Sequence, residues 1–195
     1  MKSQFTYYII TSKVDENTPL LSEETNSPDY LYERNEIQNP KLILFKFGKP
    51  LPQRPILGDY LSSPNSVISK KIYDIIAPCK IDGIQLLPSR IRGLNNEIYS
   101  DYWAIHVFNR IKCIDLKASK CIYEDNMLDD IERLVLDEKC LDEIPMAKRL
   151  VFRLKEDRSF ELYHSSLVDA IMSIKPSGIK FINIEEWNEE SIFED

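Results

Sequence analysis

The sequence predicts an α+β fold, with a mostly antiparallel or mixed sheet and two or more packed helices in one domain over residues 1–195. Strand-like segments outnumber helix-like segments, and short links between strands favour hairpins. In addition, the order strand, helix, glycine, strand occurs twice, in residues 41–88 and again in residues 149–183. We therefore expect two pseudo-repeated units that use most of the apolar residues as scaffold.

The first elements follow from side-chain type. Residues 6–11 are aromatic and β-branched, which predicts a strand. Residues 12–40 contain three prolines and no helical period, which predicts a long acidic loop. Residues 42–47 predict the next strand, because Gly48 and Pro50 follow it.

The first helix is expected to begin at Ser63, with Pro64 in its first turn and Pro78 after its end. Its buried face is a set of isoleucines with helical spacing. These are Ile68, Ile72, Ile75 and Ile76. Gly83 then permits a tight turn with a backbone conformation that other residues disfavour, before a strand over residues 84–87.

Between the two units, residues 101–108 are apolar on both faces, which is typical of a central strand. Residues 111–116 and 133–136 predict further strands. In the second unit, residues 149–154 and 160–163 predict a hairpin. Ser165 or Ser166 is expected to cap the second helix.

The second helix has a buried stripe and a glycine after its end. The stripe consists of Leu167, Val168, Ile171 and Ile174. Gly178 is expected to turn the chain into a strand over residues 179–184, with the same unusual backbone conformation as Gly83. Residues 184–195 form an acidic C-terminal segment.

The formal net charge of −7 is unevenly distributed. Residues 12–39 contain seven acidic and two basic side chains, residues 124–143 contain nine and two, and residues 184–195 contain six and none. Such blocks are most often solvated loops and tails. The alternative is a surface that attracts a basic partner.

The cysteines and the absence of targeting signals predict a cytoplasmic protein without a membrane partner. Cys79, Cys113, Cys121 and Cys140 are irregularly spaced and contain no CxxC pair, which favours free thiols over zinc or disulfides. The sequence contains no signal-peptide core and no run of about 20 apolar residues.

Catalytic motifs are missing. His106 lies in an aromatic strand and His164 precedes a helix, and neither has a partner at a metal-ligand spacing. Five widely spaced glycines exclude a phosphate-binding loop, and no serine lies in a GxSxG motif. Asp115 and Ser119 are explained by an Asp-stabilised turn. We therefore expect no catalytic, cofactor or metal site.

Nucleic-acid binding also has little support, because the basic residues are scattered among acidic ones. They include Lys70, Lys71, Arg90, Arg92, Lys148 and Arg149.

Five segments resemble immunity protein family eleven of bacterial polymorphic-toxin systems, formerly a domain of unknown function. The segments are Tyr102-Trp-Ala-Ile-His-Val-Phe-Asn109, Cys113-Ile-Asp-Leu-Lys-Ala-Ser119, Lys148-Arg-Leu-Val-Phe-Arg-Leu154, Tyr163-His-Ser-Ser-Leu-Val-Asp-Ala-Ile171 and Ser177-Gly-Ile-Lys-Phe-Ile-Asn-Ile-Glu-Glu-Trp187. The resemblance covers residues 66–187. It implies a cytoplasmic antidote that binds and neutralises a cognate toxin domain, encoded by an adjacent gene, without catalysis or cofactor.

The candidate partner-binding residues lie in the acidic C-terminal segment. They are Glu185, Glu186, Trp187, Glu189 and Glu190. The carboxylates would steer a basic toxin and the indole would anchor it. The alternatives are a small hydrolase or transferase with an Asp/His/Ser site, and a structural module of a larger assembly. An enzyme should show a concave site with convergent polar groups, whereas an antidote should show an exposed acidic and aromatic patch.

Overall fold

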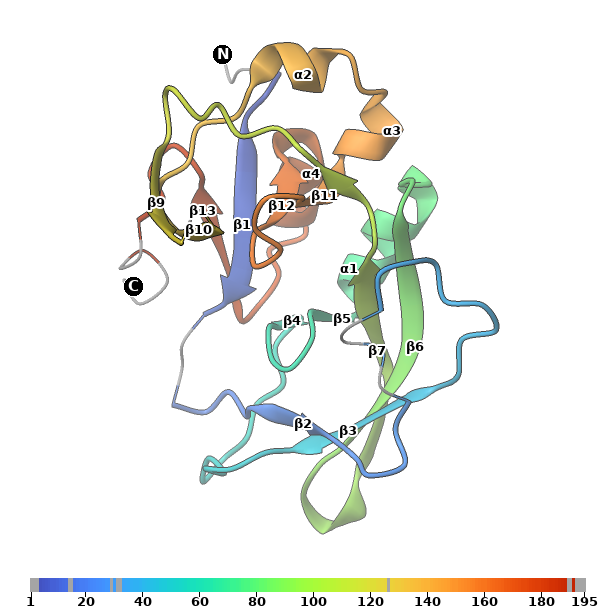
Figure 1. The fold of residues 1–195 in the computed structure, drawn as a ribbon. Coiled ribbons are helices and arrows are strands. Elements are labelled where there is room, and N and C mark those ends of the chain that lie inside the picture. Colours follow the sequence, from blue (N-terminus) through green and yellow to red (C-terminus); the bar gives the residue numbers. More distant parts are fainter. Residues whose placement is uncertain are drawn as a thin grey trace.

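The fold is described by a computed structural model, which covers residues 4–13, 16–28, 30, 33–125, 127–188 and 191. Two sheets form its body, one in the upper and one in the lower half of Figure 1. The upper sheet has the order β13 (Ile179–Asn183), β1 (Tyr7–Ser12), β12 (Glu161–His164), β11 (Val151–Leu154), β8 (Arg110–Ile111). The lower sheet has the order β2 (Leu21–Glu23), β3 (Ile43–Phe47), β6 (Ile84–Arg92), β7 (Ile98–Val107), β5 (Val67–Ser69), β4 (Tyr60–Leu61).

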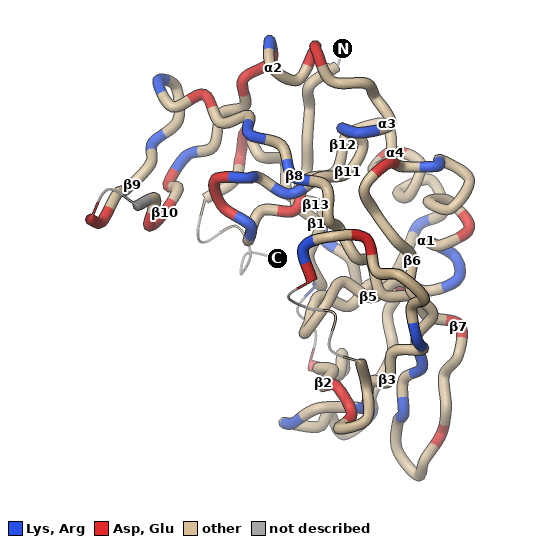
Figure 2. The backbone as a smooth tube through the Cα atoms, turned by 45° about the vertical axis from the view of Figure 1, so that its right-hand side comes forward, with Lys and Arg blue, Asp and Glu red and all other residues tan. Residues whose placement is uncertain are grey.

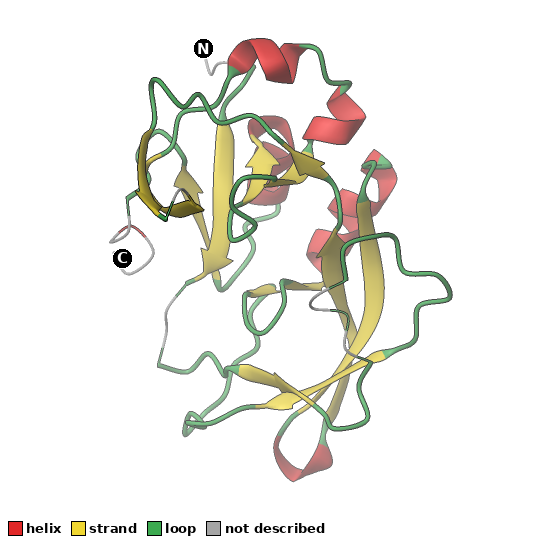
Figure 3. Ribbon diagram, viewed as in Figure 1, coloured by secondary structure: helices red, strands yellow, loops and turns green. Residues whose placement is uncertain are grey.

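A separate two-stranded hairpin and several short helices complete the fold. The hairpin consists of β9 (Lys120–Glu124) and β10 (Met127–Arg133). The helices are α1 (Lys70–Ile76), η1 (Ala77–Cys79), η2 (Leu94–Asn96), α2 (Glu138–Asp142), α3 (Met146–Arg149) and α4 (Ser165–Ser173). Figure 3 shows α2 and α3 at one end of the molecule and η2, at the tip of the β6–β7 hairpin, at the other. The predicted α+β class is confirmed.

Both large sheets are held mainly by antiparallel pairs, with one parallel pair in each. β3 runs parallel to β6, and β8 runs parallel to β11. The predicted hairpin of the second unit is confirmed, because β11 and β12 pair antiparallel with Phe152 opposite Leu162. The predicted central strand is also confirmed, since β7 lies between β6 and β5.

The first predicted helix is shorter than expected. It begins at Lys70, and Ser69 rather than Ser63 is its N-cap. Ile68 belongs to β5 and pairs with Trp103 of β7. Pairing of this β-branched side chain with the sheet outweighs its helical spacing. Ile72 and Ile76 remain the buried face of α1.

The second predicted helix is confirmed, but its cap is wrong. His164 is the N-cap of α4, and its Nδ1 accepts a hydrogen bond from the Ser166 backbone N–H at 3.1 Å. Its Nε2 lies 2.8 Å from the Gln4 carbonyl oxygen. An imidazole therefore replaces the hydroxyl that normally caps a helix.

The region between the units differs most from expectation. In place of the strand expected over residues 111–116, the structure has only the end of β8 and one bridge between Ile114 and Leu136. In place of the strand expected over residues 133–136, it has only the last residue of β10 and the same bridge. Strands β2, β4, β9 and most of β10 and helices α2 and α3 were not predicted. β2 lies within the expected loop 12–40. Apolar periodicity is weak in these elements, because they are short and mostly exposed on one side.

The two pseudo-repeated units share local order but not sheet position. Gly83 (φ +82°) and Gly178 (φ +68°) each follow a helix and precede a strand, and both adopt the left-handed conformation expected of them. However, β3 pairs directly with β6, whereas β12 and β1 lie between β11 and β13. The first and last strands of the second unit are therefore separated by β12 and by the N-terminal strand β1.

The two sheets share a core around α1 and α4. Ile72 and Ile76 of α1 belong to the same buried cluster as Val168 and Ile171 of α4. Beside it, Asp59 accepts hydrogen bonds from the Ser177 backbone N–H at 2.8 Å, from the Ser177 hydroxyl at 3.0 Å and from the Ser69 hydroxyl at 2.7 Å. Burial alone would raise the pKa of Asp59, but these hydrogen bonds and Lys71 hold it below its usual value.

Candidate functional sites

The hairpin of β9 and β10 presents acidic and aromatic side chains to solvent. Leu128 and Ile131 pack inward, in the same hydrophobic cluster as Phe160 of the upper sheet's edge. Tyr123 points outward and is 53% exposed, and Ile122 beside it is exposed as well. Two β-bulges interrupt the β9–β10 register, which explains why simple alternation does not reveal this hairpin.

The acidic C-terminal segment lies against the same cluster. Glu185 and Glu186 are exposed, as a solvated or binding role requires. Trp187 is only 9% exposed, and its ring meets Phe160 edge-on at 4.8 Å between centroids. In this structure the indole is a core side chain. Glu189 and Glu190 lie outside the described residues.

These two segments form what we call the acidic face. Its exposed carboxylates are Glu124, Asp125, Asp129, Glu185 and Glu186. The shared cluster of Ile131, Ile184 and Trp187 holds hairpin and C-terminal segment together. In Figure 2 acidic residues gather at the β9–β10 end, while basic residues are prominent near α3 and α1. Lys120 is paired with Glu132, so part of the local positive charge is already neutralised.

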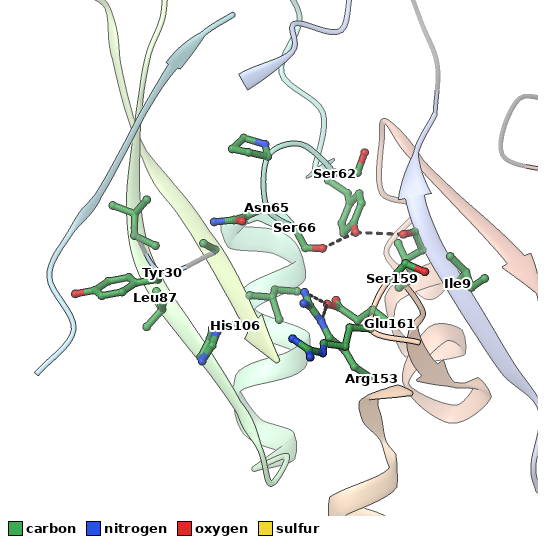
Figure 4. A pocket seen from close by; sticks show the side chains of 17 residues that line it. Ile9, Tyr30, Ser62, Asn65, Ser66, Leu87, His106, Arg153, Ser159 and Glu161 are labelled. Carbon is green, nitrogen blue, oxygen red and sulfur yellow. Dashed lines mark hydrogen bonds and ion pairs between the residues drawn. The ribbon is translucent and has the colours of Figure 1, made fainter. Parts of the chain in front are cut away.

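A cavity of about 270 Å³ lies between the two sheets (Figure 4). Figure 4 shows Arg153 and Glu161 side by side on the wall formed by β11 and β12, and their closest N–O distance is 2.9 Å. The Tyr60 hydroxyl lies 2.9 Å from that of Ser66 and donates to the Ile10 carbonyl oxygen at 3.2 Å. Burial raises the pKa of Tyr60, and the Glu161 carboxylate adds to this rise.

The polar groups of this inter-sheet cavity bond to one another. Glu161 accepts a hydrogen bond from Tyr163 as well as the Arg153 ion pair. His106 lines the cavity, but its Nε2 lies 2.9 Å from the Asn35 carbonyl oxygen. The His164 Nδ1 lies 2.8 Å from the Ser166 hydroxyl, but its Nε2 contacts the Gln4 carbonyl oxygen rather than a carboxylate. Of the cavity's hydrogen bonds, the one from the Tyr60 hydroxyl of β4 to the Ile10 carbonyl oxygen of β1 joins the two sheets.

A second concavity, which we call the crossover pocket, opens where the chain passes from β7 into β8. It has a volume of about 640 Å³. Its charged lining residues are Asp82, Arg110, Lys148, Lys155 and Arg158. Sequence analysis singled out only Lys148 of these, because four separate chain segments supply the pocket. Of the other basic residues named there, Lys71 and Arg92 are paired with acids, and Arg149 is buried.

Other candidate chemistry is sparse in the described part of the chain. Cys79, Cys113, Cys121 and Cys140 are free thiols, and burial raises the pKa of Cys113. Among the residues described, no three His, Cys, Asp or Glu side chains gather as a metal ion would need. None of the described helices is long and apolar enough to span a bilayer.

Comparison with protein families gives a match over most of the chain. The model of the Immunity protein family (Imm11) matches residues 8–186, which include both sheets, the hairpin and the start of the C-terminal segment. The match extends the resemblance seen in residues 66–187 to the N-terminal strands. No curated protein matches the chain.

Proposed function

The chain belongs to the Immunity protein family (Imm11), and we propose on this basis that it binds and neutralises a cognate bacterial toxin domain without catalysis. We place this activity in the cytoplasm and the toxin in an adjacent gene. The observation that carries the proposal is the family match over both sheets.

The proposed contact surface is the acidic face. Its carboxylates belong to segments that contain far more acids than bases, and they lie on one side of the molecule. A field of one sign speeds the approach of an oppositely charged partner, so the favoured partner surface is basic. Tyr123 adds an exposed aromatic side chain of the kind that anchors interfaces.

The inter-sheet cavity supports binding over catalysis. Its Arg153 side chain bonds to Glu161, and its Tyr60 hydroxyl bonds to Ser66 and to the Ile10 carbonyl oxygen, so these four groups are already engaged within the protein. His106, the histidine that lines it, contacts a backbone carbonyl oxygen through Nε2 rather than a nucleophile. We therefore propose that protection is stoichiometric.

Co-expression with the toxin encoded next to this chain tests the proposal. We expect host survival and a complex recovered by affinity pull-down, and a toxin from an unrelated system serves as the control. Survival without a complex, or protection at strongly substoichiometric amounts, would contradict the proposal and favour an enzyme that reverses the damage.

The acidic C-terminal segment, which contributes Glu185 and Glu186 to the acidic face, is tested by an acidic-face variant, in which Glu185, Glu186, Glu189 and Glu190 are replaced by glutamine. Charges at the edge of an interface act mainly on association rate. We expect slower association and weaker salt dependence with an unchanged fold, since the described members of the set are exposed. Unchanged rates would return this segment to the role of a solvated tail.

A further inference from the structure

The crossover pocket concentrates positive charge in an acidic protein. Four cationic side chains and one carboxylate line it, although the chain has a net charge of −7. The cations come from β8, from α3 and from the turn between β11 and β12. They are Arg110, Lys148, Lys155 and Arg158. The fold, not the sequence, brings them together.

Within the described part of the chain, none of these four cations forms an ion pair. The acids nearest in sequence are bonded elsewhere: Glu156 accepts from the Ile114 backbone N–H at 3.2 Å, and Asp157 accepts from that of Ser159 at 2.9 Å. Asp82 is the one carboxylate in the lining.

Arg110 is surrounded by other positively charged side chains. Its Nε is buried without a hydrogen-bond partner in the structure. Burial lowers the pKa of Arg110, and the guanidinium groups of Arg158, Arg34 and Arg153 lower it further. An unpaired buried donor among like charges costs free energy, and an anion in the pocket would remove that cost.

The walls of the pocket are fixed by hydrogen bonds. The backbone N–H groups of Phe108 and Asn109 both donate to the Gly83 carbonyl oxygen at 3.0 Å. The Asn109 side chain donates to the Lys148 carbonyl oxygen, and the Asp82 N–H donates to that of Ala147 at 2.9 Å. These hydrogen bonds fix the backbone that carries the cations, so ligand binding should need little reorganisation of the backbone.

We propose that the crossover pocket binds an anion that carries two or more phosphoryl groups, of which pyrophosphate is the simplest. Arginine presents a planar fork that matches phosphate oxygens, and lysine adds a mobile point charge. Four cations on separate segments suit several charged groups better than a single carboxylate. The volume of about 640 Å³ falls in the range of small-molecule sites.

Isothermal titration of the full chain with sodium pyrophosphate at constant ionic strength tests this site. We expect saturable binding to the wild type, with inorganic phosphate weaker. The double variant Lys155→Gln/Arg158→Gln should raise the Kd at least tenfold, and Lys148→Gln should raise it less. All three side chains are exposed, so folding should be retained.

The matched control is Lys117→Gln/Lys139→Gln, which removes two exposed positive charges outside the pocket and should leave the Kd unchanged. Titration with ADP distinguishes a nucleotide from a free polyphosphate, according to which binds more tightly. Absence of saturable pyrophosphate binding would overturn the proposal, as would equal losses in both double variants. Binding of hexaglutamate in place of pyrophosphate would also overturn it, in favour of an acidic peptide.

The site is independent of the proposed toxin contact. The acidic face and the crossover pocket share no residue, and in Figures 1 and 2 the β9–β10 hairpin lies on the opposite side from α3. A failed titration would therefore leave the antidote proposal intact, and a failed pull-down would leave the pocket intact.

Discussion

The acidic face and the crossover pocket are charged in opposite ways and are built differently. The face consists of residues that are neighbours in the sequence, such as Glu124 and Asp125, or Glu185 and Glu186. The pocket takes single residues from distant segments, such as Asp82, Arg110 and Lys155. A cluster of charged residues that are adjacent in the sequence can be predicted from the sequence alone. A cluster that the fold assembles from distant segments cannot.

The two regions also differ in how their charges act on a binding partner. The face consists of carboxylates exposed to solvent, where charges are screened by salt and act mainly on association rates. The pocket is concave and contains a partly buried guanidinium, where a bound anion would interact with several groups at once. We therefore expect the face to control kinetics and the pocket to hold a discrete ligand.

The largest expected effect is on the free energy of unfolding, and it should distinguish Trp187 from Tyr123, the two aromatic side chains of the segments that form the acidic face. Trp187→Ala removes a nearly buried indole and should lower the free energy of unfolding by about 3–5 kcal/mol. Tyr123→Ala should change it by about 0.5 kcal/mol or less, because that ring is exposed. Urea unfolding measures both. Equal stability of the two variants would show that Trp187 does not pack as described.

The next effect concerns the scaffold of the crossover pocket. A Cβ at Gly83 would lie 2.3 Å from the Asn109 Cβ, in a backbone with φ +82°. Backbone strain of about 1 kcal/mol and overpacking of about 1–3 kcal/mol predict that Gly83→Ala destabilises the protein by about 2–4 kcal/mol.

The matched control is Lys80→Gly, since Lys80 has φ +47° in the same connection. Glycine relieves strain at such a position, so stability should stay within about 1 kcal/mol of the wild type. Urea unfolding compares the two variants. A fully stable Gly83→Ala protein would contradict the packing of Asn109 on this turn.

A smaller effect should appear on acidification. Burial lowers the pKa of His164, although its hydrogen bond to Gln4 opposes the shift. The unfolded chain then binds a proton more readily, so this contribution to stability is present above about pH 6.5 and is lost as the pH falls towards the lowered pKa. His164→Asn should flatten the profile between pH 7 and pH 5.

The acidic-face variant serves as the control for His164→Asn. It should keep the wild-type dependence of stability on pH in this range. Neither Glu185 nor Glu186 is a hydrogen-bond partner of the His164 imidazole, which contacts Gln4 and Ser166. Thermal unfolding at several pH values measures the difference. A flat wild-type profile, or a profile flattened by the acidic-face variant instead, would contradict the role of His164.

Prediction from sequence succeeded where one residue decides the local structure. Gly83, Gly178 and the stripe of α4 were identified because backbone conformation and helical periodicity are local properties. It failed at Ile68, whose strand pairing depends on Trp103, and at the hairpin, whose bulges break alternation. Trp187 was chosen as an anchor from its acidic neighbours, but its burial depends on Phe160.

The association rate with the cognate toxin tests the central claim most directly. It should be measured at two salt concentrations for the wild type, the acidic-face variant and Lys155→Gln/Arg158→Gln. We predict that the acidic-face variant associates more slowly and with weaker salt dependence, while the pocket variant associates at least as fast as the wild type. A wild-type rate for the acidic-face variant, together with a slower pocket variant, would contradict the assignment of toxin binding to the acidic face.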